Sequence, residues 1–141
     1  MKKFVKVKSN RSGEIAKLNM QLIEDEGHSN PMDLEQLRDR MSDWLDSEYS
    51  CYVIEENGRI VTYSLWRDDG EYYYLRHLFT CREHRLKGYA KTLLRQLEVE
   101  FYHDKPIRLE VLEGNDESMR FYERLGYYTY ACTMQKPVNN E

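Results

Sequence analysis

A short charged turn between an apolar stretch and an amphipathic stretch carries the residue types that could bind an anion. Arg85, Lys87 and Lys91 surround Gly88. The apolar residues that follow recur at helical spacing: Ala90, Leu93, Leu94, Leu97 and Phe101. The first turn of a helix leaves backbone amides without partners and carries the positive end of the helix dipole, and Gly88 has no side chain to keep a ligand away. The turn therefore predicts a site for a phosphate or pyrophosphate group.

The phosphate loop of nucleotide hydrolases is excluded as an explanation of this turn. Lys91 and Thr92 look like the end of its signature. That signature needs a Gly directly before the Lys and another Gly five residues earlier. Ala90 and Arg85 occupy those two places, so the turn does not match this signature.

A second motif lies downstream, over residues 115–127. Asn115 begins a helical pattern, Tyr122 lies inside it, and Leu125, Gly126 and Tyr127 end it. Together with Arg85, Gly88 and Ala90 after a strand, this motif resembles the signature of the GNAT N-acetyltransferase superfamily. The resemblance extends over residues 72–134, and Leu86 and Ala90 stand where many members have Gly.

The resemblance implies a binding site for acetyl-CoA as the co-substrate. The pyrophosphate would lie on the backbone amides of Arg85, Leu86, Lys87, Gly88, Tyr89, Ala90 and Lys91. The backbone of Leu78, Phe79 and Thr80 would hold the thioester carbonyl and the pantetheine arm, where this strand and the strand at residues 107–112 run parallel and splay apart. An amide directed at the developing oxyanion is worth about 3 kcal/mol of barrier. Without the resemblance, the same residues would be an ordinary core strand and a solvated turn.

The resemblance also gives Tyr122 the role of the acid that protonates the departing thiolate. Its phenol, with an ordinary pKa of about 10, is protonated at neutral pH. A packed aromatic residue is the alternative for Tyr122, and Asn115 suits both a helix cap and a coenzyme contact. Tyr74 stands near the place where some relatives keep a Glu, so the general base is left open among Glu24, Asp25, Glu26, His28 and a water bound to them.

An acidic run between the first two predicted helices is the candidate for the acceptor side. Glu24, Asp25, Glu26 and His28 lie in the turn that, in relatives, commonly forms one wall of the acceptor site. Carboxylates are unfavourable at a helix C-terminus, so local helix stability does not explain them. We expect a small cationic amine as the acceptor, with a solvated turn as the alternative reading.

Composition limits the class of protein. The chain has 141 residues, of which 40% are hydrophobic and 33% charged, which suits one soluble domain over residues 1–141. No apolar run reaches the roughly 18 residues of a membrane span, and no signal peptide is visible. We therefore expect a cytoplasmic protein that does not associate with a membrane. A net charge of −4 argues against nucleic-acid binding, and the three separated cysteines suggest reduced thiols and no metal site.

Periodicity and turn residues predict the order β-α-α-β-β-β-α-β-α-β, an α/β (α+β) fold of the GNAT kind with a mixed, mostly antiparallel sheet. The last predicted strand covers residues 127–134. Asn57 and Gly58 predict a hairpin, and Asp33 with Gln36 predicts a capping box.

The expected function is that of an acyltransferase: acetyl transfer from acetyl-CoA to a primary amine by direct attack in a ternary complex. The acceptor would be a small-molecule amine or a basic peptide. A protein N-terminal or lysine acetyltransferase and a non-catalytic acyl-CoA binding or sensor module remain as alternatives. Exposed aromatic residues in the last predicted strand are compatible with a homodimer.

Overall fold

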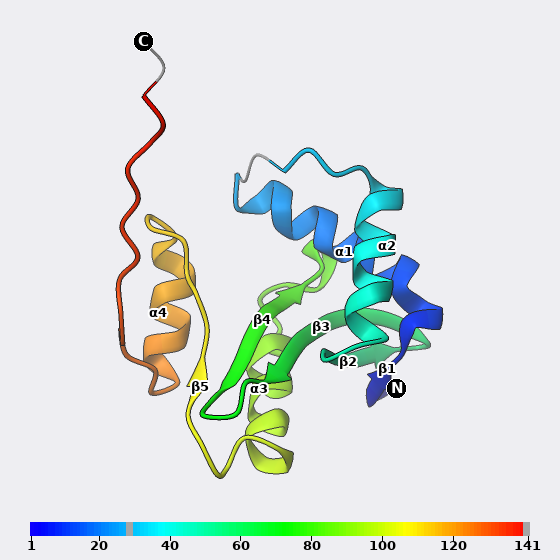
Figure 1. Ribbon diagram of the computed structural model, residues 1–141. Helices are drawn as coiled ribbons and strands as arrows, with labels where there is room; N and C mark the ends of the chain where they lie inside the picture. Colours follow the sequence, from blue (N-terminus) through cyan, green and yellow to red (C-terminus); the bar gives the residue numbers. More distant parts are fainter. Residues whose placement is uncertain (28–29, 140–141) are drawn as a thin grey trace. The chain divides into compact units, whose positions relative to one another are not determined.

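The computed structural model describes residues 1–27 and 30–139, which divide into two compact units, residues 1–110 and 111–141. Each unit is described by itself. In the described residues of the first unit, five strands form one sheet in the order β1-β2-β3-β4-β5 (Figure 1). The strands are β1 Lys2–Val7, β2 Ser50–Glu56, β3 Arg59–Asp68, β4 Tyr73–Thr80 and β5 Ile107–Arg108. Neighbouring strands are antiparallel except β4 and β5, which are parallel.

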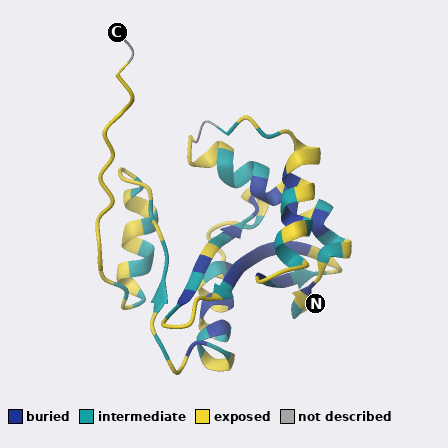
Figure 2. Cartoon of the chain, in the orientation of Figure 1, coloured by how far each residue is buried: buried dark blue, intermediate teal, exposed yellow. Residues whose placement is uncertain are grey.

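Three helices of this unit, α1 Ser12–Asp25, α2 Leu34–Leu45 and α3 Tyr89–Glu100, cover the sheet. Helices α1 and α2 pack on one face and α3 on the other (Figure 1). The aromatic contacts show both faces: Trp44 of α2 touches His77, while Phe101 after α3 touches Trp66. Strand β3 is buried from residue 60 to residue 66 because both of its faces are covered, as the dark blue ribbon of Figure 2 shows.

Local sequence signals account for most of the boundaries in this unit. Asn57 and Gly58 both adopt left-handed backbone, with φ of 54° and 81°, and they close the β2–β3 hairpin as predicted. The reciprocal hydrogen bonds of the capping box between Asp33 and Gln36 are both formed. Ser12 is the first residue of α1, and its hydroxyl donates to the carbonyl of Ser9 (2.7 Å).

The second unit holds α4, Asp116–Arg124. Asn115 caps this helix through its side-chain oxygen, which accepts from the amide of Ser118 (3.2 Å), and Gly126 leaves it with a φ of 95°. Both features were predicted. The strand predicted over residues 127–134 is a correction: these residues form none, since the described part of this unit offers no other strand for pairing.

Strand β5 is also shorter than the predicted residues 107–112. It pairs with β4 through Tyr73 and Ile107 and through Tyr74 and Arg108, and the pairing then stops. No helix in the described residues has the length and apolar character needed to cross a membrane.

Candidate functional site

One edge of β4 is open over its C-terminal half. Leu78, Phe79 and Thr80 pair with β3 on one side, opposite Ser64, Tyr63 and Thr62. On the other side, the described residues of the first unit provide a strand only as far as Tyr74. Backbone groups on that edge need partners, so this half of β4 offers a ladder for an extended ligand. The parallel pairing of β4 and β5 was expected from the sequence, and it ends after two residue pairs.

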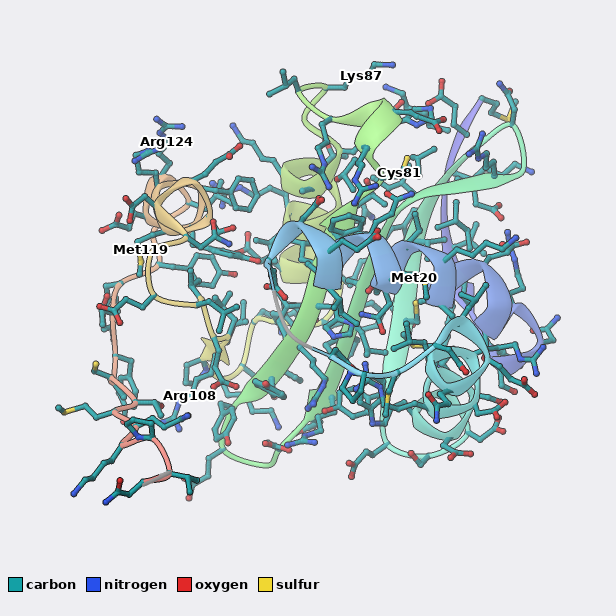
Figure 3. The ribbon with its side chains drawn as sticks, turned by 90° about the horizontal axis from the view of Figure 1, so that it is seen from above. Met20, Cys81, Lys87, Arg108, Met119 and Arg124 are labelled. Atoms are coloured by element: carbon teal, nitrogen blue, oxygen red, sulfur yellow. The ribbon has the colours of Figure 1, made fainter. Side chains whose placement is uncertain are left out.

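The turn after β4 leads directly into the N-terminus of α3. A short 3₁₀ helix, Arg82–His84, follows the strand, and Gly88 precedes α3 with a φ of 78°. No side chain caps this helix, so none occupies the first amides of α3 from the cap position. Figure 3 shows Lys87 at the outer edge of the turn and Cys81 nearer the sheet. The turn therefore has the backbone geometry of an anion site.

Leu86 also adopts left-handed backbone, with a φ of 65°. Its side chain is fully exposed, so packing does not compensate the roughly 1–2 kcal/mol that this conformation costs a residue with a Cβ. A Gly at this position would adopt the same conformation without that cost. Strain of this kind persists where a backbone shape is needed for function.

Tyr89 anchors the start of α3 to the sheet. Its side chain is buried, and its hydroxyl donates a hydrogen bond to the carboxylate of Glu56 at the end of β2. Cys81 and His84 approach each other within the same turn, with 3.0 Å between Sγ and Nδ1. Only the backbone of Tyr89 is therefore available to a coenzyme, because its side chain has a structural role.

The acidic end of α1 is bound to this turn through arginines. Arg82 donates to Glu24 (3.1 Å) and to Asp25 (3.0 Å), and Arg85 donates to Asp25. Partial burial alone would raise the pKa of Asp25, but the hydrogen bonds from Arg85 and Arg82 lower it below its usual value. These ion pairs explain the carboxylates at the helix C-terminus. Glu26 ends the same helix, and His28 lies outside the described residues.

The two predicted site residues of the second unit have clear local surroundings. Asn115 caps α4, and the ring of Tyr122 contacts Phe121 and Tyr127 at centroid distances of 5.1 Å and 5.5 Å. The role of Tyr122 as an acid stays a prediction.

A polar cluster on the α2 side of β4 was not predicted. The β3–β4 register shifts between Leu65 and Trp66, which face His77 and Leu75, so Arg76 is an extra residue in β4. Both Arg76 and His77 then contact Trp44, although neighbours in a regular strand point to opposite faces. A bulge leaves no clear signal in a single sequence.

His77 is held neutral in this cluster. Its Nδ1 lies 3.0 Å from the hydroxyl of the buried Tyr63. Loss of solvent lowers the pKa of His77 to about 3, and the charges of Arg76 and Arg40 act in the same direction. Its imidazole is therefore too weak a base to hold the proton of an alkyl ammonium group at neutral pH.

This low pKa predicts that His77 makes stability depend on pH. The folded state favours neutral imidazole, so the contribution is fully present above the unfolded pKa of about 6.5 and is lost as the pH falls toward 3. Between about pH 7.5 and pH 5, the free energy of unfolding should fall by about 2 kcal/mol more in the wild type than in His77→Asn, because Asn does not titrate. Urea unfolding of both proteins at the two pH values measures the difference. An equal fall in unfolding free energy in both proteins would contradict the low pKa of His77.

The family model described as the acetyltransferase (GNAT) family matches residues 17–127. A comparison with curated proteins gives no match.

Three solved structures share the fold at low sequence identity. A possible acetyltransferase from Clostridium difficile 630 is 18% identical, with a TM-score of 0.79 over 100% of this chain and 99% of that one. A predicted acetyltransferase from Clostridium acetobutylicum, solved with acetyl-CoA, is 17% identical, with a TM-score of 0.76 over 97% and 96%. An aminoglycoside N-acetyltransferase in complex with CoA is 12% identical, with a TM-score of 0.76 over 99% and 96%. With the family model matching more than half of its length, the chain belongs to the GNAT acetyltransferase family.

Proposed function

We propose that this protein transfers an acetyl group from acetyl-CoA to a primary amine by direct attack in a ternary complex. The observation that carries the proposal is the open edge of β4, which runs into a helix N-terminus without a side-chain cap. An extended pantetheine arm matches the first feature and a pyrophosphate matches the second. Two of the similar structures contain CoA or acetyl-CoA.

The proposal gives the residues of β4 and of the following turn separate roles. The backbone of Leu78, Phe79 and Thr80 would hold the thioester, and that of Arg85, Leu86, Lys87, Gly88, Tyr89, Ala90 and Lys91 would hold the pyrophosphate. Exposed Lys87 and Lys91 would add positive charge beside the phosphates. Arg85 would contribute mainly through its backbone, because its guanidinium group binds Asp25 and the carbonyl of Thr80.

The chemical step requires a neutral amine, which attacks the thioester carbonyl carbon. The new C–N bond forms as the C–S bond breaks, and the phenol of Tyr122 would give its proton to the thiolate. Because the pKa of His77 is about 3, the proton of the ammonium form would leave through solvent. We therefore expect kcat/KM to rise with pH up to the acceptor's own pKa.

The proposed acceptor is a small-molecule amine, and the acidic run at the end of α1 does not define its charge. The expectation of a cationic acceptor relied on Glu24, Asp25, Glu26 and His28, and the arginines of the turn balance two of these charges. We therefore propose a small-molecule amine, the class of substrate that the name of the aminoglycoside N-acetyltransferase of similar fold indicates for that enzyme. The charge of the acceptor outside the reacting amine is inferred from other residues of the first unit.

Initial rates test this function. Thiol release from acetyl-CoA should depend on an added amine, and reciprocal plots at several fixed concentrations of the second substrate should intersect, as ternary-complex kinetics require. Parallel lines would instead indicate an acetylated enzyme. Coenzyme binding without thiol release for any small amine or peptide would favour the non-catalytic module.

A further inference from the structure

Two arginines on the α2 side of β4 lack the carboxylate partners that most arginines of the first unit have. Seven arginines there form ion pairs with carboxylates: Arg11, Arg38, Arg59, Arg67, Arg82, Arg85 and Arg95. Within the described residues of this unit, Arg40 and Arg76 contact no carboxylate; their partners are neutral groups. The charge of Arg76 acts on Arg40, and neither guanidinium group has a carboxylate as a contact partner in the described residues of this unit.

Neutral side chains hold both guanidinium groups in place. The guanidinium carbons of Arg40 and Arg76 lie over the ring of Trp44, 4.4 Å and 4.7 Å from its centroid. Arg40 also donates to the side-chain oxygen of the buried Asn19 (3.1 Å), and Arg76 donates to the hydroxyl of Tyr49 (3.2 Å). Cation–π contacts and hydrogen bonds of this kind orient an arginine while leaving its charge uncompensated.

The electrostatic cost of this arrangement is visible at Arg40. Its Nε atom is buried and has no hydrogen-bond partner among the described residues. Burial lowers the pKa of Arg40, and the charge of Arg76 lowers it further, although an arginine stays protonated. An anion bound at these groups would reduce this repulsion and accept charge-assisted hydrogen bonds from them. Arg76 is exposed, so a ligand in solution can reach it.

Arg76 lies on β4 close to the residues that would hold the thioester. Arg76 precedes Leu78 by two residues, which is about 7 Å along a strand. If Leu78 holds the thioester, a group bound by Arg76 lies only a few bonds from the amine that attacks it. Like the roles of β4 in acetyl transfer, this step rests on the proposed function.

We propose that Arg40 and Arg76 bind a carboxylate of the acceptor, so that the acceptor is a small amino carboxylate, such as an amino acid, with the amine a few bonds from the acid. The bulge at Arg76 gives this site its geometry, because it directs Arg76 to the same face as His77 and Trp44. Arg40 completes the site from α2.

The test compares amino acids with their amides, which keep the amine and lose the negative charge. Calorimetry on the protein saturated with CoA measures binding, and thiol release from acetyl-CoA measures transfer. The acids should bind about 10- to 100-fold more tightly than the amides, as expected for charge-assisted hydrogen bonds. The preference for amino acids over their amides should fall in the Arg76→Gln and Arg40→Gln variants, while the affinity of both variants for CoA stays unchanged.

Arg38→Gln is the matched control, because Arg38 lies on the same helix and already pairs with Glu35 and Asp39. It should keep the preference for acids. If Arg40→Gln does not fold, the exposed Arg76→Gln decides the question. Equal binding of acids and amides by the wild type, an unchanged preference in Arg76→Gln, or stronger binding of aminoalkyl phosphonates than of acids would overturn the proposal. Absence of transfer with every acceptor would overturn the proposed function instead, while the binding comparison would still decide the carboxylate site.

Discussion

Replacing Tyr122 with Phe should lower the turnover number about 10²- to 10⁴-fold, as the loss of a general acid does. The phenyl ring keeps the packing against Phe121 and Tyr127, so the fold of α4 and the affinity for acetyl-CoA should change little. Steady-state rates at saturating acceptor, with a calorimetric measurement of coenzyme affinity, separate the two effects.

The control for this variant is Tyr128→Phe. Tyr128 follows α4 in the same unit and is exposed, so removal of its hydroxyl should not affect the rate. An unchanged turnover number in Tyr122→Phe would make Tyr122 a packing residue and leave the thiolate to be protonated by another group.

Replacing Gly88 with Trp should weaken acetyl-CoA binding at least about 100-fold, because the indole would occupy the space that the pyrophosphate needs. A Cβ at Gly88 meets no atom within 4 Å, so the space beside this backbone is open. Loss of binding should also remove the increase in melting temperature that acetyl-CoA gives the wild type.

The backbone strain of this substitution needs its own control, because Gly88 has a φ of 78°. Gly58→Trp is suitable: Gly58 has a φ of 81°, an equally open Cβ position, and a place in the β2–β3 hairpin. It should lose stability and keep its affinity for acetyl-CoA. If Gly88→Trp binds acetyl-CoA with the affinity of the wild type, the pyrophosphate site does not lie at this turn.

The parts of the fold that the sequence predicts are those with local causes. The hairpin at Asn57 and Gly58, the capping box of Asp33 and Gln36, and the cap at Asn115 each depend on residues within three positions of one another. Backbone conformations and caps of this kind are determined by side-chain chemistry close in the chain, so a single sequence contains them.

The parts that it does not predict depend on distant partners. Asp25 pairs with Arg85, sixty positions away, and a single sequence does not reveal this contact between the end of α1 and the turn before α3. The bulge at Arg76 depends on how β4 meets β3, and residues 127–134 lack a strand because pairing needs a neighbour that their pattern cannot supply. Register and pairing are tertiary properties, and propensity alone does not determine them.

The central claim is that this protein moves an acetyl group from acetyl-CoA to the nitrogen of a small amine. The most direct test supplies acetyl-CoA with an isotopically labelled acetyl group, together with a panel of amino acids and simple amines, and identifies the products by mass spectrometry. We expect the label on the nitrogen of an amine, with one free CoA thiol for each acetylated product. Saturable binding of acetyl-CoA with no label on any amine would contradict the claim.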